Sequence, residues 1–322
     1  MDFLLLIIGL ILVVGGANYL TDGASSIAKK KGISPLVIGL TIVAFGTSAP
    51  ELAVSLSSAL KGNGDIAVGN VVGSNILNIL LIGGAAAVLR PLSVSRSSVK
   101  YEIPLCILFS VILCLLGMDI PFWGSENNQL SRWDGGLLLI CFVVFFAYTF
   151  WITTKSKKEA ANASVEVKVQ KLWLSALMVV GGLAGLIFGG DLFVDNAVAI
   201  AQRYHVSESV IGLTIVAIGT SLPELATSVV AAIKGEDDIA IGNIVGSNIF
   251  NLSFILGLSS CITPLSIKGI GVLDMSMMIG SAILLLFFGL LGGERKILRV
   301  EGAVFLLVFA VYVYLLLSKG HA

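Results

Sequence analysis

The chain has 322 residues, of which 57% are hydrophobic and only 12% are charged. Soluble domains carry roughly 25% charged residues, so this composition excludes an ordinary soluble protein and indicates one that lies in a lipid bilayer. Lys and Arg together number 20, as do Asp and Glu, and this balance gives no indication of a nucleic acid or another polyanionic partner.

Apolar stretches of about 20 residues, the length that crosses the hydrocarbon core, recur along the whole chain. The first, MDFLLLIIGLILVVGG, lacks a basic leader and an evident cleavage site, so we expect a retained span rather than a signal peptide. In chain order the predicted helices are 3–26, 33–60, 65–89, 101–118, 135–152, 172–198, 206–233, 238–262, 272–291 and 301–318. The sequence therefore predicts an all-α polytopic membrane protein with ten transmembrane helices.

The longest polar interval, 153–171, separates the first five predicted helices from the last five. We therefore expect a first half at 1–152, a linker, and a second half at 172–322. Fifteen of the 20 basic residues fall in or beside the loops after helices one, three, five, seven and nine. Because cytoplasmic loops are enriched in Lys and Arg, the linker is predicted to be cytoplasmic and both termini extracytoplasmic, in a multi-pass cell membrane protein.

One stretch occurs twice, once in each half. Residues 39–78 read GLTIVAFGTSAPELAVSLSSALKGNGDIAVGNVVGSNILN, and residues 212–251 read GLTIVAIGTSLPELATSVVAAIKGEDDIAIGNIVGSNIFN. At a constant offset of 173, 28 of the 40 positions are identical without a gap. Since five helices is an odd number, the second half enters the membrane from the opposite side, and two inverted-topology repeats are predicted. Such repeats are typical of secondary transporters, whose substrate sites lie near the bilayer midplane where the repeats meet.

Each repeat contains a proline that predicts an interrupted helix. Pro50 and Pro223 cannot donate a backbone hydrogen bond, so the carbonyls of Gly46 and Gly219 lose their helical partners. Inside a membrane, freed carbonyl oxygens have to be satisfied by protein, water or ions.

Polar side chains in the repeats stand four residues apart, which places each pair on one helix face. The pairs are Thr47 with Glu51, Thr220 with Glu224, Ser74 with Asn78, and Ser247 with Asn251. All are hard oxygen ligands without an accompanying His or Cys, which disfavours zinc, copper and iron and suits calcium or sodium. Any single hydroxyl could instead be a packing residue. A carboxylate near the bilayer centre costs ~2.5 kcal/mol or more, so Glu51 and Glu224 indicate cations or protons as partners.

Four further acids lie near helix ends. Asp65 and Asp238 begin predicted helices, and we expect them to act as N-caps. Asp22 and Asp195 occupy matched positions in the first and sixth helices and could be gate or interface residues.

The motifs GTSAPE and GTSLPE, followed by GNVVGSN and GNIVGSN, resemble the two alpha repeats of the calcium/cation antiporter superfamily, the sodium/calcium exchangers. The resemblance covers both repeats, and it is to the short microbial form without cytosolic calcium-regulatory domains. It implies ten helices in two inverted halves, ion sites among helices two, three, seven and eight, calcium and sodium as transported ions, and no cofactor. The ligands that it implies are Glu51 and Glu224, shared by both ions, the side chains of Thr47, Thr220, Ser74, Ser247, Asn78, Ser48 and Ser221, and the carbonyls of Ala44 and Ala217.

One position departs from the family pattern. Exchangers of this type often carry an aspartate where this chain has Asn251, so the chain offers two central carboxylates. One calcium ion or two monovalent cations would neutralise them, and a third sodium ion would leave the site positive in a medium where unpaired charge is costly. We therefore expect either fewer than three sodium ions per calcium ion or protons as the counter-ion.

The predicted function is antiport of calcium against sodium by alternating access, with helices one and six as the moving part and calcium/proton exchange as the alternative. Channels also line their pores with oxygen atoms, but inversion within one chain favours alternation. A membrane enzyme is disfavoured because the cysteines lie in apolar runs, both histidines lie outside the repeats, and GTSAP is not a nucleophile elbow. The expected partners are inorganic cations and the lipid bilayer, with no nucleic acid and no evident protein partner.

Overall fold

The computed structural model describes residues 2–124, 127–160, 170–204, 217–291 and 295–319. Eight helices in these ranges are long and apolar enough to cross a membrane: Asp2–Lys31, Gly64–Leu89, Ser98–Gly117, Arg132–Ile152, Leu172–Arg203, Asp237–Ile262, Val272–Leu291 and Arg299–Ser318. Pro35–Thr47 and Ala49–Leu60 form a further span if the two pieces count as one. A polytopic helical membrane protein is thereby confirmed. The predicted helix 206–233 begins outside the described residues, and the number ten stays a prediction.

The chain folds into two compact units, and each takes segments from both sequence repeats. The first unit comprises Met1–Pro50 and Thr149–Asn243, and the second comprises Glu51–Tyr148 and Ile244–Ala322. The halves 1–152 and 172–322 therefore describe how the sequence repeats and not how the chain packs. Helix α9 (Arg132–Ala160) also continues past residue 152, so the first part of the predicted linker is helical.

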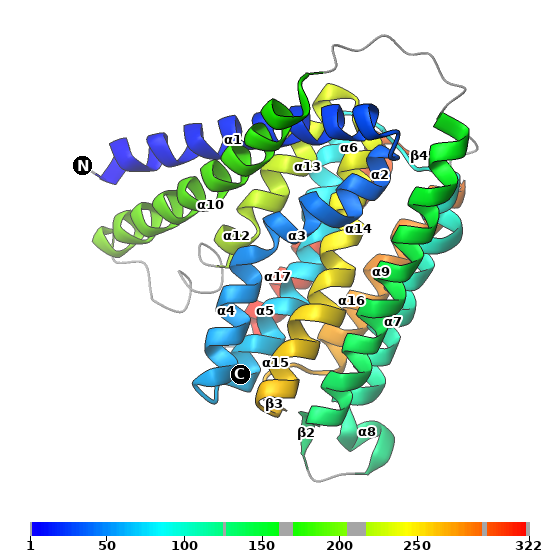
Figure 1. The fold of residues 1–322 in the computed structure, drawn as a ribbon. Helices are drawn as coiled ribbons and strands as arrows, with labels where there is room; N and C mark the ends of the chain where they lie inside the picture. The colour runs from blue at the N-terminus through cyan, green and yellow to red at the C-terminus, as the bar shows by residue number, and fades with distance from the viewer. Residues whose placement is uncertain (1, 125–126, 161–169, 205–216, 292–294, 320–322) are drawn as a thin grey trace. The chain divides into compact units, whose positions relative to one another are not determined.

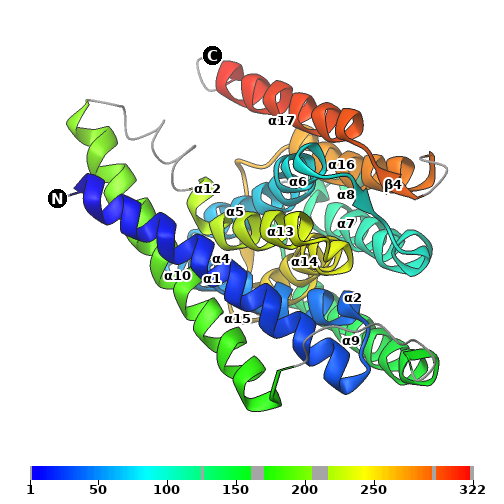
Figure 2. The same cartoon turned by 90° about the horizontal axis from the view of Figure 1, so that it is seen from above.

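The first unit is built from helices near the start of each repeat. Its elements are α1 (Asp2–Lys31), α2 (Pro35–Ile38), the π-helix η1 (Gly39–Val43), α3 (Ala44–Thr47), α10 (Leu172–Arg203), α12 (Ala217–Thr220), α13 (Leu222–Lys234) and the first part of α14 (Asp237–Phe250). Helices α1 and α10 lie side by side (Figures 1 and 2).

Four glycines bring α1 and α10 into backbone contact, and we call them the glycine seam: Gly9, Gly16, Gly182 and Gly189. A Cβ at Gly16 would lie 2.7 Å from the carbonyl oxygen of Gly182, and a Cβ at Gly182 would lie 2.7 Å from that of Gly16. Gly9 and Gly189 oppose each other in the same way, so the two helices run antiparallel. Gly9 matches Gly182, and Gly16 matches Gly189, at the offset of 173, so the seam joins equivalent helices with two-fold symmetry. Small residues permit this close approach in membranes.

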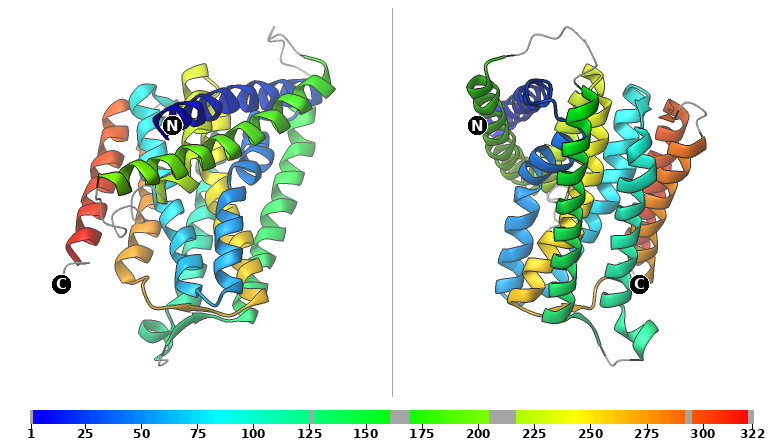
Figure 3. Two further views of the ribbon diagram at one scale, coloured as in Figure 1. Left: turned by 90° about the vertical axis from the view of Figure 1, so that its left-hand side faces the viewer. Right: turned by 45° about the vertical axis from the view of Figure 1, so that its right-hand side comes forward.

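The second unit holds the remaining elements. They are most of α4 (Ala49–Leu60), α5 (Gly64–Leu77), the π-helix η2 (Asn78–Gly83), α6 (Gly84–Leu89), β1 (Leu92–Ser93), the π-helix η3 (Ser98–Glu102), α7 (Ile103–Gly117), α8 (Asp119–Trp123), β2 (Asn128–Leu130), most of α9, the π-helix η5 (Asn251–Ile255), α15 (Leu256–Ile262), β3 (Leu265–Ile267), α16 (Val272–Leu291), β4 (Lys296–Ile297) and α17 (Arg299–Lys319). Helix α17 packs along α6, and α16 packs along α7 (Figure 3).

Two short antiparallel strand pairs join loops of the second unit, and the sequence did not predict them. Leu92 of β1 pairs with Ile297 of β4, and Leu130 of β2 pairs with Leu265 of β3. Leu92 and Leu265 are equivalent at the offset of 173, yet β4, the partner of β1, and β3 lie at opposite ends of this unit (Figure 1). Repeats of opposite orientation require this placement. The inversion of the complete halves stays a prediction.

Candidate ion-binding site

The two proline motifs interrupt their helices at matched serines. Ser48 lies between α3 and α4 with φ −82° and ψ 10°, and Ser221 lies between α12 and α13 with φ −91° and ψ 10°. Both fall in the sparsely populated region between helix and strand, where active-site residues often occur. The predicted interruptions are confirmed, and each lies two residues before its proline because the missing N–H ends the preceding helical hydrogen-bond ladder.

The two glutamates lie in the first turns after these interruptions, where the helix dipole favours a negative charge. Glu51 and Glu224 are each 1% exposed. In the first unit the Ser48 hydroxyl donates to Oε1 of Glu224 at 2.8 Å. In the second unit the Ser74 hydroxyl donates to Oε1 of Glu51 at 3.5 Å. Ser48 and Glu224 belong to different repeats, so the two motifs meet within the first unit.

Thr47 is held by an asparagine of the other repeat. Its hydroxyl donates to Oδ1 of Asn243 at 3.1 Å. Nδ2 of Asn243 in turn donates to Oγ of Ser228 at 2.9 Å and to the Glu224 carbonyl at 3.4 Å. Asn243 therefore fixes both the Thr47 hydroxyl and the backbone at Glu224.

Asn70 does the same in the second unit. Its Nδ2 donates to Oγ of Ser55 at 3.0 Å and to the Glu51 carbonyl at 3.2 Å. Asn70 matches Asn243, and Ser55 matches Ser228, at the offset of 173. No role was predicted for these residues from the sequence, although Asn70 and Asn243 each follow a glycine in a Gly-Asn dipeptide that both repeats share.

A second set of asparagines, which we call the asparagine brace, lies where α5 and α14 cross within the second unit. The brace comprises Asn75, Asn78, Asn248 and Asn251, and each is at most 1% exposed. Nδ2 of Asn75 donates to the Asn248 carbonyl, and Nδ2 of Asn248 donates to the Asn75 carbonyl, both at 3.2 Å. Nδ2 of Asn78 donates to Oδ1 of Asn248 at 3.0 Å, and Nδ2 of Asn251 donates to Oδ1 of Asn75 at 3.1 Å. No role was predicted for Asn75 and Asn248 from the sequence.

Three oxygen atoms near the brace are buried and have no hydrogen-bond partner among the residues that the structure describes: Oδ1 of Asn78, Oδ1 of Asn251 and Oγ of Ser247. Buried polar atoms without partners are rare in native proteins, and each requires an explanation. A cation would account for all three, because hard cations bind amide and hydroxyl oxygens.

The remaining candidate ligands lie in the first unit. Ala217 opens α12, Thr220 ends it half-buried, and Ser221 is buried directly after it. The Ala44 carbonyl accepts hydrogen bonds from the Ser48 N–H at 3.0 Å and from the Thr47 hydroxyl at 3.4 Å. Within the described ranges, no group of three or more His, Cys, Asp or Glu side chains is placed to hold a metal ion. A cation bound to these residues would therefore draw mainly on hydroxyl, amide and carbonyl oxygens.

Asp65 contributes to an interface rather than to a helix cap. The prediction that Asp65 and Asp238 are N-caps is wrong, because α5 begins at Gly64 and α14 begins at Asp237. Oδ1 of Asp65 instead accepts the backbone N–H groups of Lys268 and Gly269 in the loop after β3.

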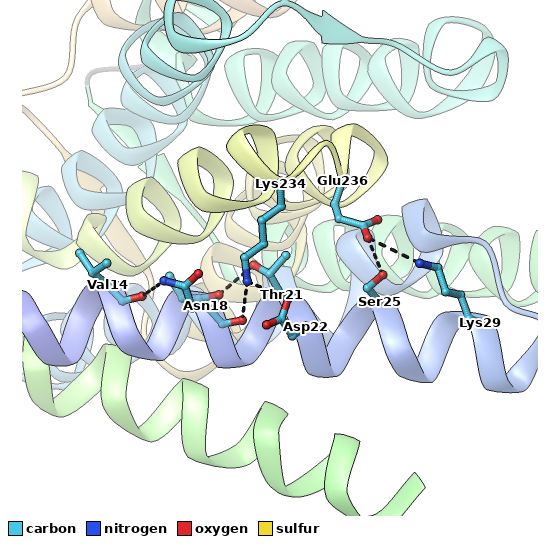
Figure 4. A network of polar contacts seen from close by, with 9 residues as sticks. Val14, Asn18, Thr21, Asp22, Ser25, Lys29, Lys234 and Glu236 are labelled. Atoms are coloured by element: carbon cyan, nitrogen blue, oxygen red, sulfur yellow. Dashed lines mark hydrogen bonds and ion pairs between the residues drawn. The ribbon is translucent and has the colours of Figure 1, made fainter. Parts of the chain in front are cut away.

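Asp22 is an interface residue, as one of the two sequence interpretations held. Its carboxylate accepts from Nζ of Lys234 at 2.7 Å, which links α1 to α13 (Figure 4). Nearby, Oε1 of Glu236 accepts from the Ser25 hydroxyl at 2.7 Å and lies 3.8 Å from Nζ of Lys29 (Figure 4). The end of α13 is therefore tied to α1 by surface charges.

The sequence pattern of the family described as sodium/calcium exchanger protein matches residues 1–151 and 174–318. The chain is 42% identical to CaxA of Alkalimonas amylolytica, over 97% of this chain and 98% of that protein. It is 33% identical to the sodium/calcium exchanger MaX1 of Methanosarcina acetivorans, over 98% of each chain. Its fold matches a solved structure of the sodium-calcium exchanger NCX_Mj with a TM-score of 0.82 and 31% identity, over 97% of each chain.

Proposed function

Because the chain belongs to the sodium/calcium exchanger family, we propose that it is an antiporter that exchanges calcium for sodium by alternating access. Membership makes it a multi-pass membrane protein of a transporter family. The observation that carries the proposal is a pair of buried glutamates, Glu51 and Glu224, at matched positions after matched helix interruptions. Hydroxyl groups donate to both carboxylates, so each is held in place for a cation.

The proposed ligands are all oxygen atoms. Glu51 and Glu224 bind calcium and its counter-ions in turn. The proposed supporting ligands are the side chains of Thr47, Ser48, Ser74, Asn78, Thr220, Ser221, Ser247 and Asn251 and the carbonyls of Ala44 and Ala217. The buried amide oxygens of Asn78 and Asn251 support their place in this set. Neutral oxygens provide coordination without adding charge, so the two glutamates set the charge of the site.

Exchange follows from the charge of the site. An empty site with two ionised glutamates carries two negative charges, which are costly to move through a low-dielectric interior. Bound cations neutralise these charges, so the loaded states can change their access and the empty state cannot. The glycine seam supports α1 and α10 as the moving part, since close backbone contact between them lets the pair move as one body.

The neutral side chain at Asn251 bears on the counter-ion. Two sodium ions match the charge of two glutamates, as two protons would, whereas three sodium ions leave one positive charge without a partner. We therefore keep calcium/proton exchange as the second candidate and place sodium coupling below three ions per calcium ion.

We also propose that the protein lies in the cell membrane with both termini outside the cytoplasm. The distribution of Lys and Arg among the loops supports this orientation. Labelling a cysteine added at the C-terminus with a membrane-impermeant reagent in intact cells tests it, and labelling only after lysis would reverse it.

Calcium-45 uptake into proteoliposomes loaded in turn with sodium, potassium or acid tests the function. We expect uptake driven by an outward sodium gradient, or by acid if the second candidate holds, with little net current in either case. Uptake that needs no counter-ion gradient would indicate a channel. A large sodium-dependent current would contradict the charge-matched stoichiometry.

A further inference from the structure

The orientation of the four amides in the asparagine brace follows from groups that can only accept hydrogen bonds. A backbone carbonyl cannot donate, so the atoms of Asn75 and Asn248 that face the opposite carbonyl at 3.2 Å are their Nδ2 groups. Their Oδ1 atoms are then available only to donors.

The donors that meet them are the Nδ2 groups of Asn78 and Asn251. Oδ1 of Asn248 accepts from Asn78 at 3.0 Å, and Oδ1 of Asn75 accepts from Asn251 at 3.1 Å. With both Nδ2 groups engaged, Oδ1 of Asn78 and Oδ1 of Asn251 take no part in the hydrogen bonds of the brace. Both oxygens are buried and meet no donor among the described residues.

The backbone supports the same two positions. Asn78 is the first residue of η2, and Asn251 is the first residue of η5. Single π-helical turns inside α-helices occur frequently at functional sites because they re-aim side chains. The brace therefore holds two side chains just where their helices change their winding.

We propose that Asn75 and Asn248 are positioning residues that aim the amide oxygens of Asn251 and Asn78 at the transported cation and select an amide over a carboxylate at position 251. This inference rests on the proposed function. An aspartate at position 251 would set a carboxylate oxygen against Oδ1 of Asn75, where two acceptors repel. Asn75 could donate to it only by turning its amide, which would break its bond to the Asn248 carbonyl.

The main test is transport by Asn248→Leu, which keeps a side chain of similar size and removes the acceptor for Asn78. We expect the KM for calcium to rise about 10-fold with kcat within about twofold of wild type, the usual size of effect when a group behind a metal ligand is removed. Ser260→Ala is the control, because Ser260 is buried in the same unit and, among the described residues, its hydroxyl bonds only to backbone carbonyls. An unchanged KM in Asn248→Leu would overturn the proposal.

A double-mutant cycle separates positioning from general support of the fold. If Asn248 acts through Asn78, adding Asn248→Leu to Asn78→Ala raises the KM less than about twofold further. If the KM of the double variant rises by the product of the two single-variant increases, Asn248 does not act through Asn78 and the positioning role is wrong. Wild-type exchange in the same vesicles is measured first. If the wild type shows no exchange, the proposed function is wrong, and not only the positioning role of the asparagine brace.

A stability measurement applies even where Asn248→Leu fails to insert. We expect Asn251→Asp to lower the Tm in detergent in the native background and to lower it clearly less in an Asn75→Ala background, where the opposing acceptor is gone. Equal decreases in the two backgrounds would show that Asn75 does not discriminate against the carboxylate.

Discussion

The glycine seam of the first unit and the asparagine brace of the second unit are both symmetric crossings of equivalent helices, yet they are held in opposite ways. In the seam, backbone meets backbone at Gly9, Gly16, Gly182 and Gly189. In the brace, four directed hydrogen bonds link the asparagines, two of them between side chains and two from a side chain to a backbone carbonyl. Hydrogen bonds weaken steeply with misalignment, so the brace is suited to holding ligands in place. The seam brings two backbones close together, so it is suited to joining α1 and α10 as one pair.

Replacing either central carboxylate should have the largest effect on transport. We expect Glu51→Gln and Glu224→Gln each to reduce calcium-45 exchange by at least ~100-fold, because the one remaining carboxylate leaves a bound calcium ion with an unneutralised positive charge in a low-dielectric interior. The amide keeps the size of the side chain, so insertion and Tm should stay near wild type. Normal transport by both variants would disprove the site.

A methyl group in the seam should have the next largest effect. Gly16→Ala places a Cβ against a backbone carbonyl that cannot give way, and overpacking of this kind costs about 1–3 kcal/mol. We expect a lower Tm and slower exchange. Gly15→Ala is the matched control, since a Cβ there meets nothing within 4 Å, and it should leave the Tm unchanged or higher. Equal behaviour of the two variants would show that the seam is not a tight contact.

Removing a hydroxyl group that donates to a glutamate should have a smaller effect, on the affinity for calcium. Ser48→Ala deletes the 2.8 Å hydrogen bond to Glu224, and a bond to a charged group contributes about 1.5–3 kcal/mol. We expect about a 10-fold rise in the KM for calcium. Ser57→Ala, at an exposed serine of α4, should leave the KM unchanged. A KM that stays constant in Ser48→Ala would exclude Ser48 from the site.

The smallest effect is expected at the charged contact between α1 and α13. The Lys234 and Asp22 side chains are 27% and 52% exposed, and surface ion pairs contribute about 0–1 kcal/mol. Lys234→Gln should therefore change the Tm and the exchange rate little, and less still at high salt. A severalfold change in exchange rate would mean that α1 is restrained by this pair and not by the seam alone.

Features that depend on local chemistry were predictable from the sequence. The missing N–H of Pro50 and Pro223 predicts the interrupted helices, which the structure places at Ser48 and Ser221. Features that depend on packing between distant segments were not. Asn75 donates to the carbonyl of Asn248 in the other repeat, and the sequence around Asn75 does not indicate this partner. Strands of two or three residues are too short to show alternation, and α5 begins one residue earlier than its acid suggested.

The strand pairs of the second unit bear on how this protein is made. Leu92 pairs with Ile297, and Leu130 pairs with Leu265. Strands β1 and β2 therefore cannot pair until segments much later in the chain have been synthesised. Strands without a partner expose backbone donors and acceptors that can associate with other chains. A nascent chain released before residue 265 would therefore carry two strands, β1 and β2, whose backbone groups are unpaired. The second unit can complete its fold only after the whole polypeptide has been synthesised.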